Sequence, residues 1–519
     1  MQKYENMLYC QTNKNVYLCK LANNKNINTM SKNYNQKKLT LLVSLFICLS
    51  SMLNAQWVSP GDGTTYTFPD LVNVTDGVVT NGPDGFIINA DLTISANDVL
   101  KIDDHVLRVD IDAVLITING SMICTNANRV RFYGQNETQH FSMRFENATN
   151  CNLHNMYFSD GAGIKVIESD VTFDDVKFVY FTTEYCHSVI DILNCNPTIE
   201  NCYFLLNEGA AIGSPANGQS SPKILNCEFD SNVDGANLPQ INLGPGAEDT
   251  IYIVGNLVDG TYASFHTGGI SVADLMNTGE TKILLKDNII KNNRYGYNQQ
   301  GYCLSSTIIG NKFLDNHHED NPMNGGSGIS IYGMDGNNKA IIRNNVITGN
   351  LWGITAIYFH DINLGTEDDW GNNEIHDNGN SGVVYDLYNN STCNIMAVGN
   401  DWGTTSEQEV EDHIVHQNDD ASLGLVTFVP FIDYDAVNET HLSSFDVLPN
   451  PVSNGVFRLV LNDNTPSELV VYNLNGQIVK SQYLENKVNT IDVSLLKSGV
   501  YFVEVKSAEK TMLKKIIVE

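Results

Sequence analysis

Basic residues are scarce in this chain. Its 519 residues include 30 Lys and Arg but 60 Asp and Glu, and residues 56–444 alone carry 15 basic against 51 acidic residues. A field of this sign repels phosphate backbones, so we exclude nucleic acid as a partner. It also disfavours anionic polysaccharides unless cations bridge the contact, while self-repulsion keeps an exposed surface soluble.

Metal-binding motifs are missing as well. No Cys-x-x-Cys pair occurs among the 11 cysteines, so zinc is not expected. No loop has the D-x-D-x-D-G spacing of a calcium site. The sequence therefore predicts no cofactor, with weak Ca²⁺ binding by Asp-rich loops left open as the alternative to plain solvation of those loops.

No apolar run is long enough to span a bilayer. The clearest one, residues 39–49, follows Lys37 and Lys38 and is followed by a short segment ending in the small residue Ala55. A basic start, a short apolar region and a small residue before the cut are typical of a secretory signal peptide, which we place at residues 30–55.

This signal sets the N-terminal boundary of the mature chain. Cleavage after Ala55 leaves Gln56 as the first residue, and no transmembrane span is expected beyond it. Residues 1–29 do not fit a signal peptide. We interpret them as an upstream extension, with translation starting at Met30.

Sequence patterns typical of helices are nearly absent, and Asn and Gly, which favour turns, occur at frequent intervals along the chain. A six-residue motif recurs, with Asn or Cys first, a bulky apolar residue third and Asn or Gly last. Its first positions are Cys202, Cys227, Asn256, Asn288, Asn311, Asn345, Asn373 and Asn400. Irregular intervals around a fixed core indicate one structural unit with loops of varying length, as in a solenoid.

Apolar residues alternate around this motif. A Gly usually follows it and opens another alternating segment, such as Ile329-Ser330-Ile331. Period two predicts strands. Three short strands per coil, over about thirteen coils, predict an all-β fold, a right-handed parallel β-helix. The Asn and Cys residues then stack at one turn, where amides hydrogen-bond along the stack and free thiols are sufficient.

The repeats resemble those of pectate-lyase-like β-helix proteins. The resemblance covers residues 150–433, and residues 56–149 look like an N-terminal region with the first coils. We expect a short helix at residues 407–416 to cover the open end, because a solenoid needs caps.

The C-terminal segment changes character. It is denser in apolar residues, it balances eight basic with eight acidic residues, and its strands read Leu469–Leu474, Val500–Val505 and Lys514–Glu519. Residues 445–519 resemble the sorting domain of the Bacteroidetes type IX secretion system. This implies a small immunoglobulin-like β-sandwich, the export machinery as partner, and release or attachment to surface lipopolysaccharide. Few contacts are expected to cross the linker, residues 434–444.

Catalysis on this architecture is expected on the outside of the strands that follow the Gly. Their predicted outward residues are Lys165, Ser271, Ser330, Tyr332, Thr355 and Val384. A lyase needs a basic residue beside acidic cation ligands. Lys165 and Asp386 lie about seven coils, or roughly 34 Å, apart at the ~4.8 Å strand spacing and cannot cooperate.

The best catalytic candidates are Asp335, Asp361 and Asp386, which fall in consecutive loops and could form the carboxylate pair of a hydrolase. The alternative is that they are only solvated. Two hypotheses follow. The chain is an exported surface protein for adhesion or glycan contact, or it is a polysaccharide lyase or glycoside hydrolase acting on extracellular polysaccharide.

Overall fold

The computed structural model describes most of the chain after the predicted signal peptide. The described residues are 56–135, 140–235, 237–334, 337–432, 445–453, 455–461, 467–474, 476–484, 486–506 and 511–519. The predicted extension 1–29, the signal peptide 30–55 and the linker 434–444 lie outside them. Residues 56–519 form one compact unit.

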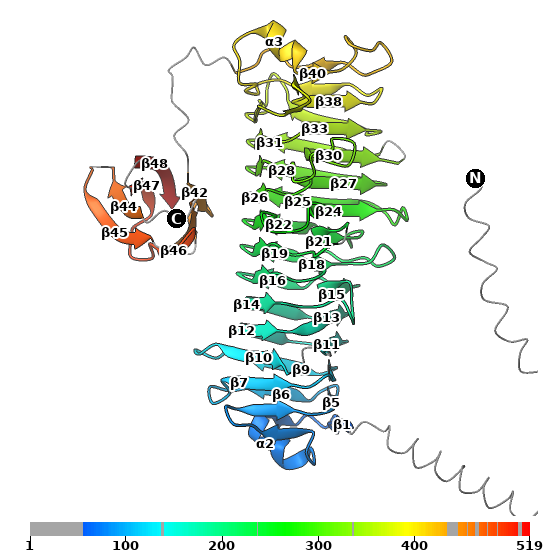
Figure 1. The fold of residues 1–519 in the computed structure, drawn as a ribbon, viewed down its shortest axis with the longest axis vertical. Coiled ribbons are helices and arrows are strands. Elements are labelled where there is room, and N and C mark those ends of the chain that lie inside the picture. Colours follow the sequence, from blue (N-terminus) through cyan, green and yellow to red (C-terminus); the bar gives the residue numbers. More distant parts are fainter. Residues whose placement is uncertain are drawn as a thin grey trace, which may run out of the picture. The chain divides into compact units, whose positions relative to one another are not determined.

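Most of this unit is a right-handed parallel β-helix, as predicted (Figure 1). One side, sheet A, is a single stack of 14 strands. They are β1 (Gln56–Val58), β5 (Asp91–Ile94), β8 (Leu115–Ile118), β11 (Phe141–Glu146), β13 (Gly161–Ile167), β15 (Ser188–Leu193), β18 (Ala210–Gly213), β21 (Pro239–Leu243), β24 (Gly268–Asp274), β27 (Tyr297–Gly301), β30 (Ser327–Gly333), β33 (Trp352–Ile357), β38 (Leu387–Asn390) and β40 (Ile414–Val415). Thirteen steps of ~4.8 Å give a stack of about 62 Å.

A further 25 strands form sheet B, which bends into two files. File B1 contains β2 (Thr65–Tyr66), β6 (Val99–Ile102), β9 (Ser121–Cys124), β12 (Cys151–Ser159), β14 (Val171–Val179), β16 (Thr198–Glu200), β19 (Lys223–Leu225), β22 (Ile251–Val254), β25 (Thr281–Lys286), β28 (Leu304–Ile309), β31 (Lys339–Arg343), β34 (Asp361–Gly365), β39 (Ile395–Ala397) and β41 (Val426–Thr427). File B2 contains β3 (Val79–Asn81), β4 (Phe86–Ile88), β7 (Arg108–Ile111), β10 (Val130–Gly134), the second halves of β12 and β14, β17 (Tyr203–Leu205), β20 (Glu228–Asp230), β23 (Leu257–Asp259), β26 (Ile289–Lys291), β29 (Lys312–Leu314), β32 (Val346–Thr348) and β35 (Glu374–His376). Each regular coil thus contributes three strands.

The bend between the two files is set by left-handed residues. One such residue lies in each of eight consecutive coils, with φ between 50° and 70°. These residues are Asn201, Asn226, Gly255, Asp287, Gly310, Asn344, Asn372 and Gly399. Gly, Asn and Asp tolerate this conformation best, which explains their density in the sequence.

The residue after each of these turns belongs to a buried polar ladder, which we name ladder 1. It begins at Cys202 and Cys227 and continues through the six predicted asparagines. Asn288 Nδ2 donates to Asn311 Oδ1 at 2.8 Å, and Asn311 Nδ2 donates to Asn345 Oδ1 at 3.0 Å. The chain of bonds ends at Asn400. Each amide thereby satisfies buried backbone groups of the turn.

A second ladder runs along the bend between file B2 and sheet A. Its members, ladder 2, are Asn207, Asn232, Gln240, Asn293, Asn316, Asn350, Asn378 and Asp386. In the coil between Asn232 and Asn293, strand register places Thr261 at the ladder position, and its hydroxyl donates to Asp259 instead. Gln240 reaches across from β21 to bond Asn293 at 3.1 Å.

Between the sheets lies one continuous apolar core. Inward side chains stack from coil to coil, as Phe178, Phe204 and Phe229 do at ring-centroid distances of 4.8 and 5.0 Å. Two helices close its ends (Figure 1): α2 (Phe68–Val74), which buries Phe68, and α3 (Glu407–Asp412), which buries Val410. The cap expected at residues 407–416 is thus present but shorter, because the helix ends at His413.

The C-terminal domain is a small antiparallel sandwich with its own core. One sheet contains β42 (Asp446–Leu448), β43 (Val456–Val460) and β46 (Val488–Asp492). The other contains β45 (Ile478–Leu484), β44 (Ser467–Asn473), β47 (Gly499–Lys506) and β48 (Thr511–Val518). The predicted all-β class and small second domain are therefore confirmed.

Candidate functional site

The predicted outward residues fall mostly on one line of sheet A. Strand register places Lys165, Ser271, Ser330 and Thr355 in the same outward row, which we name row A1. Its members are Thr93, Thr117, Arg144, Lys165, Asp191, Gly213, Asn242, Ser271, Asn298, Ser330, Thr355, Tyr388 and Val415. Tyr332 lies in the next outward row, two residues along β30.

Val384 does not belong to sheet A. It lies in β37 (Val383–Val384), which pairs with β36 (Gly379–Asn380) in a small antiparallel hairpin. The chain makes this detour before it re-enters sheet A at β38.

The N-terminal part of row A1 carries charge. Arg144, Lys165 and Asp191 lie side by side in three consecutive coils, about 4.8 Å apart. Tyr185, from the loop before β15, lies against Lys165, whose ammonium is 4.4 Å from the centre of the ring. A cation over an aromatic face is held by the ring quadrupole, so this pair is an ordered unit.

Arg144, Lys165 and Asp191 differ in how closely an opposite charge lies to each of them. Arg144 donates two hydrogen bonds to the Glu146 carboxylate, at 2.8 and 2.9 Å, which raises the pKa of the guanidinium. Burial raises the pKa of Asp191, although Lys165 and His187 oppose it. Among the described residues Lys165 forms no ion pair shorter than 4.0 Å, but its ammonium acts on Asp191 in the next coil.

An apolar strip lies beside the charges. Ile167 and Leu193 occupy the neighbouring outward row and, with Pro215, line a cavity of about 170 Å³ that Arg144 and Asp191 also border. Charged and apolar walls in one hollow suit a ligand that has both a polar edge and a ring face.

The rest of row A1 is uncharged. Six consecutive coils place Asn242, Ser271, Asn298, Ser330, Thr355 and Tyr388 in this row. All are partly exposed except Ser271, which is buried. Asn298 Nδ2 donates to Ser271 Oγ at 3.1 Å. These groups both donate and accept hydrogen bonds, and they demand no charge from a partner.

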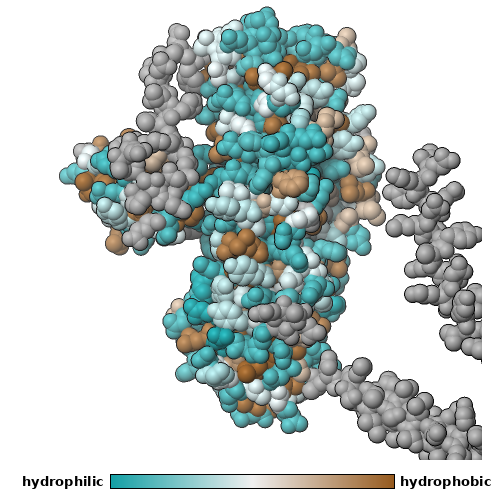
Figure 2. Space-filling model, viewed as in Figure 1, coloured by the Kyte–Doolittle hydropathy of each residue, from teal (hydrophilic) through white to brown (hydrophobic). Residues whose placement is uncertain are grey.

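Aromatic side chains gather at the C-terminal end of this row. The Trp352 ring lies 4.7 Å from that of Tyr385 and 5.6 Å from that of Tyr388. Tyr332 is 37 % exposed in the adjoining row, and Tyr358, in the loop after β33, is 66 % exposed. Figure 2 shows a mostly hydrophilic face in which apolar side chains occur as separate spots.

Of the carboxylates proposed from sequence, Asp361 and Asp386 lie in different environments. Asp335 lies outside the described residues. Asp361 is exposed at the start of β34, on sheet B, beside Lys339 of the preceding coil. Asp386 is fully buried on ladder 2, where it accepts hydrogen bonds from Asn378. Burial raises its pKa. The structure therefore gives Asp386 a place inside the solenoid and Asp361 a place on its surface.

No metal site emerges from the part of the chain that the structure describes, because no three His, Cys, Asp or Glu side chains converge there. The described helices are all too short or too polar to cross a membrane.

Sequence reasoning missed Arg144, Tyr185 and Asp191. Arg144 and Asp191 follow the same strand alternation that placed Lys165 outward. Each is separated from Lys165 in sequence by about the length of one coil. The N-terminal coils lack the repeated Asn motif, so no marker fixed which residues lie side by side.

Two family models match the chain. Residues 446–519 match the secretion system C-terminal sorting domain, and residues 297–408 match a family of proteins of unknown function. No protein of curated function matches the chain.

Two solved structures are similar to this chain over most of its length. A mutant of the periplasmic alginate epimerase AlgG is 12 % identical, with a TM-score of 0.38 over 72 % of this chain and 81 % of that one. A double mutant of the tailspike protein of E. coli bacteriophage HK620, in complex with a pentasaccharide, is 12 % identical, with a TM-score of 0.33 over 95 % of this chain and 90 % of that one.

Proposed function

The chain is a secreted parallel β-helix protein with a C-terminal secretion-system sorting domain, and on this premise we propose that it binds an extracellular polysaccharide along row A1. The observation that carries the proposal is the run of six uncharged hydrogen-bonding side chains from Asn242 to Tyr388. They repeat at ~4.8 Å, which is close to the length of one sugar unit in an extended chain.

The chemistry of the row fits sugars. Hydroxyl and amide groups exchange hydrogen bonds with sugar hydroxyls, and the rings of Trp352 and Tyr388 offer apolar faces for sugar rings. Because these residues carry no charge, the acidic field of the solenoid does not oppose a neutral polysaccharide. The charged end, with Lys165, can take an occasional acidic substituent.

Binding can be tested by affinity electrophoresis of residues 56–519 against neutral and acidic polysaccharides. We expect retardation by at least one neutral polymer and its loss in the Asn298→Ala/Ser330→Ala variant. The matched control, Thr307→Val, changes an outward residue of β28 on the opposite side of the solenoid and should bind as the wild type does. Equal retardation of all three proteins would place the binding surface elsewhere.

A lyase acting on a uronic-acid polymer is the second candidate, favoured by the contact between Lys165 and Tyr185. In such a β-elimination a base removes the proton next to the uronate carboxylate, and the glycosidic oxygen leaves with a proton from an acid. Lys165 and Tyr185 suit the proton transfers, and Arg144 suits the carboxylate. Release of unsaturated sugar ends, measured by ultraviolet absorbance and abolished in Lys165→Ala, would establish lyase activity. If no uronate polymer tested yields unsaturated ends, polysaccharide binding without catalysis is the function that stands.

On either reading we propose that the protein works outside the cell. The sorting domain addresses the chain to the export machinery, and release or attachment to surface lipopolysaccharide follows export. A surface-held solenoid would act in adhesion to the glycan that row A1 contacts.

A further inference from the structure

The outer face of file B2 contains an apolar patch that is not exposed. In β23 and β26, Val258 and Ile290 point into the core, so alternation directs Leu257 and Ile289 outward. The two are paired in register, yet they are only 3 % and 1 % exposed. The residues that flank this pair in the same row, Glu228 and Lys312, are charged, so the apolar pair needs a cover of its own.

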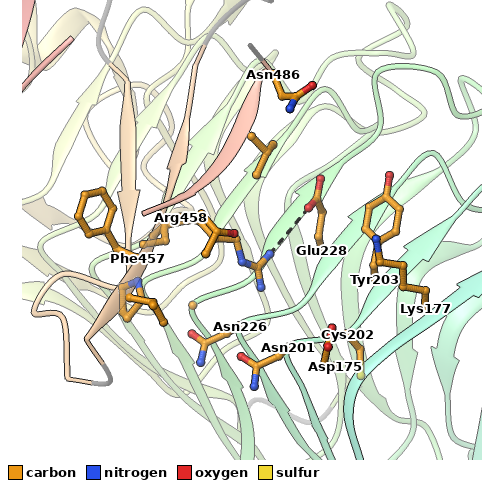
Figure 3. A pocket seen from close by; sticks show the side chains of 16 residues that line it. Asp175, Lys177, Asn201, Cys202, Tyr203, Asn226, Glu228, Phe457, Arg458 and Asn486 are labelled. Carbon is orange, nitrogen blue, oxygen red and sulfur yellow. Dashed lines mark ion pairs between the residues drawn. The ribbon is translucent and has the colours of Figure 1, made fainter. Parts of the chain in front are cut away.

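The cover comes from the C-terminal domain. Val460 of β43 packs on Leu257 and Ile289, and Leu448 and Val488 contribute from the strands on either side of β43. Within β43, Phe457 and Leu459 face the sandwich core. Figure 3 shows Phe457 pointing away from the solenoid while Arg458 extends toward it.

Three ion pairs surround this apolar contact. Arg458 lies 3.9 Å from Glu228, one coil before Leu257, and Lys487 lies 3.9 Å from Asp259. Lys312, one coil after Ile289, pairs with Asp446. In each of these three pairs a charge of the domain meets the opposite charge on the solenoid, which gives an apolar centre with a charged rim.

The charges at one end of the contact are shielded from water. Burial works to raise the pKa of Asp446, but the ammonium groups of Lys312 and Lys514 outweigh it and hold that pKa below its ordinary value. Burial and the nearby Lys312 lower the pKa of Lys514 to about 8. A cavity of about 740 Å³ remains beside the contact, lined by both domains (Figure 3).

We propose that the outer face of file B2, from β20 to β29, is a built-in docking surface whose occupant is the chain's own sorting domain. The three-stranded sheet of the domain binds there. The four-stranded sheet stays exposed, with Tyr483 and Leu513 73 % and 63 % accessible, and so remains readable by other proteins while the domain is docked. The expectation of few contacts across the linker is thereby revised, and the proposal does not depend on polysaccharide binding.

The test uses residues 56–519 with a specific protease site inserted in the linker. After the cut, the wild-type sorting domain should co-elute with the solenoid in size-exclusion chromatography. The Leu257→Asp/Ile289→Asp variant should release it, because two carboxylates replace the apolar contact. Val346→Asp, in the same outward row of β32 but outside the contact, is the matched control and should retain it.

Charge exchange gives a second arm that leaves the apolar patch intact. Glu228→Arg should weaken retention of the cut domain, and adding Arg458→Glu should restore it. Thermal melts check that every variant is folded. Separation of the wild-type fragments after cutting, or their retention in the Leu257→Asp/Ile289→Asp variant, would overturn the proposal.

Discussion

Replacing Asn311 by Leu tests the ladder that holds the coils together. Asn311 is fully buried, and its Oδ1 accepts hydrogen bonds from Asn288 N at 3.0 Å and from Asn288 Nδ2 at 2.8 Å. Its Nδ2 donates to Leu285 O at 2.8 Å and to Asn345 Oδ1 at 3.0 Å. Leucine has nearly the same size and shape, so packing is kept while these bonds are lost.

The cost follows from the groups that lose a partner. The Asn288 backbone N–H and the Leu285 carbonyl each lose the hydrogen bond to the Asn311 side chain. Asn288 Nδ2 loses one bond as well but keeps its bond to Ile253 O. At about 1–3 kcal/mol for each of these two buried unsatisfied groups, the free energy of unfolding should fall by about 2–6 kcal/mol.

Guanidinium unfolding of residues 56–519 measures this loss, and hydrogen exchange of the Asn288 amide should quicken with it. Asn311→Cys should cost less, because Cys227 shows that a thiol can donate to a neighbouring carbonyl in this slot. Thr307→Leu, outward on the same coil, is the control. An unfolding free energy within about 0.5 kcal/mol of the wild type, less than a typical net hydrogen bond, would refute the reasoning.

Three further predictions follow. Leu206 has φ of 50°, a left-handed conformation that costs a leucine about 1 kcal/mol. Leu206→Gly should therefore raise the free energy of unfolding by about 0.5–1 kcal/mol. The control, Leu205→Gly, lies in the extended strand β17 and should lower the free energy of unfolding. His413 Nδ1 lies 3.1 Å from Asp386 Oδ2, and this carboxylate raises the pKa of His413. The pair's contribution to stability is therefore complete below the ordinary pKa of 6.5 and is lost as the pH rises through the raised pKa. Protection factors of β38 amides, which correct for the intrinsic rise of exchange with pH, should fall over that window in the wild type but not in Asp386→Asn. Deleting residues 445–519 should leave the solenoid in the periplasm of the native host, and an undiminished surface or extracellular signal on fractionation would contradict the sorting role.

The repeat made most of the solenoid predictable from sequence. Each coil places a polar residue where the chain turns from file B1 to file B2, and the preceding residue must tolerate positive φ. Both requirements apply within a single turn. Asn or Cys therefore recurs at the ladder position and Asn, Asp or Gly at the position before it, while the loops between motifs vary in length. The small sandwich was predicted from the resemblance of residues 445–519 to a secretion-system sorting domain.

The site was less predictable because it depends on register between coils. Arg144, Lys165 and Asp191 meet only because three coils without a sequence marker align in sheet A. Asp386 shows the opposite difficulty. Loop-like sequence surrounds it, but the hairpin β36–β37 turns the chain so that Asp386 completes ladder 2, where Asn378 bonds to it.

Ladder 1 makes the length of the solenoid adjustable. Every asparagine in its central part donates to the next coil and accepts from the previous one, so all its rungs are interchangeable. A tandem duplication of residues 288–310 would present the same donors and acceptors at both junctions and would extend every stack by one step. The fold can therefore grow or shorten by whole coils, and the number of sugar-sized positions along row A1 would change with it.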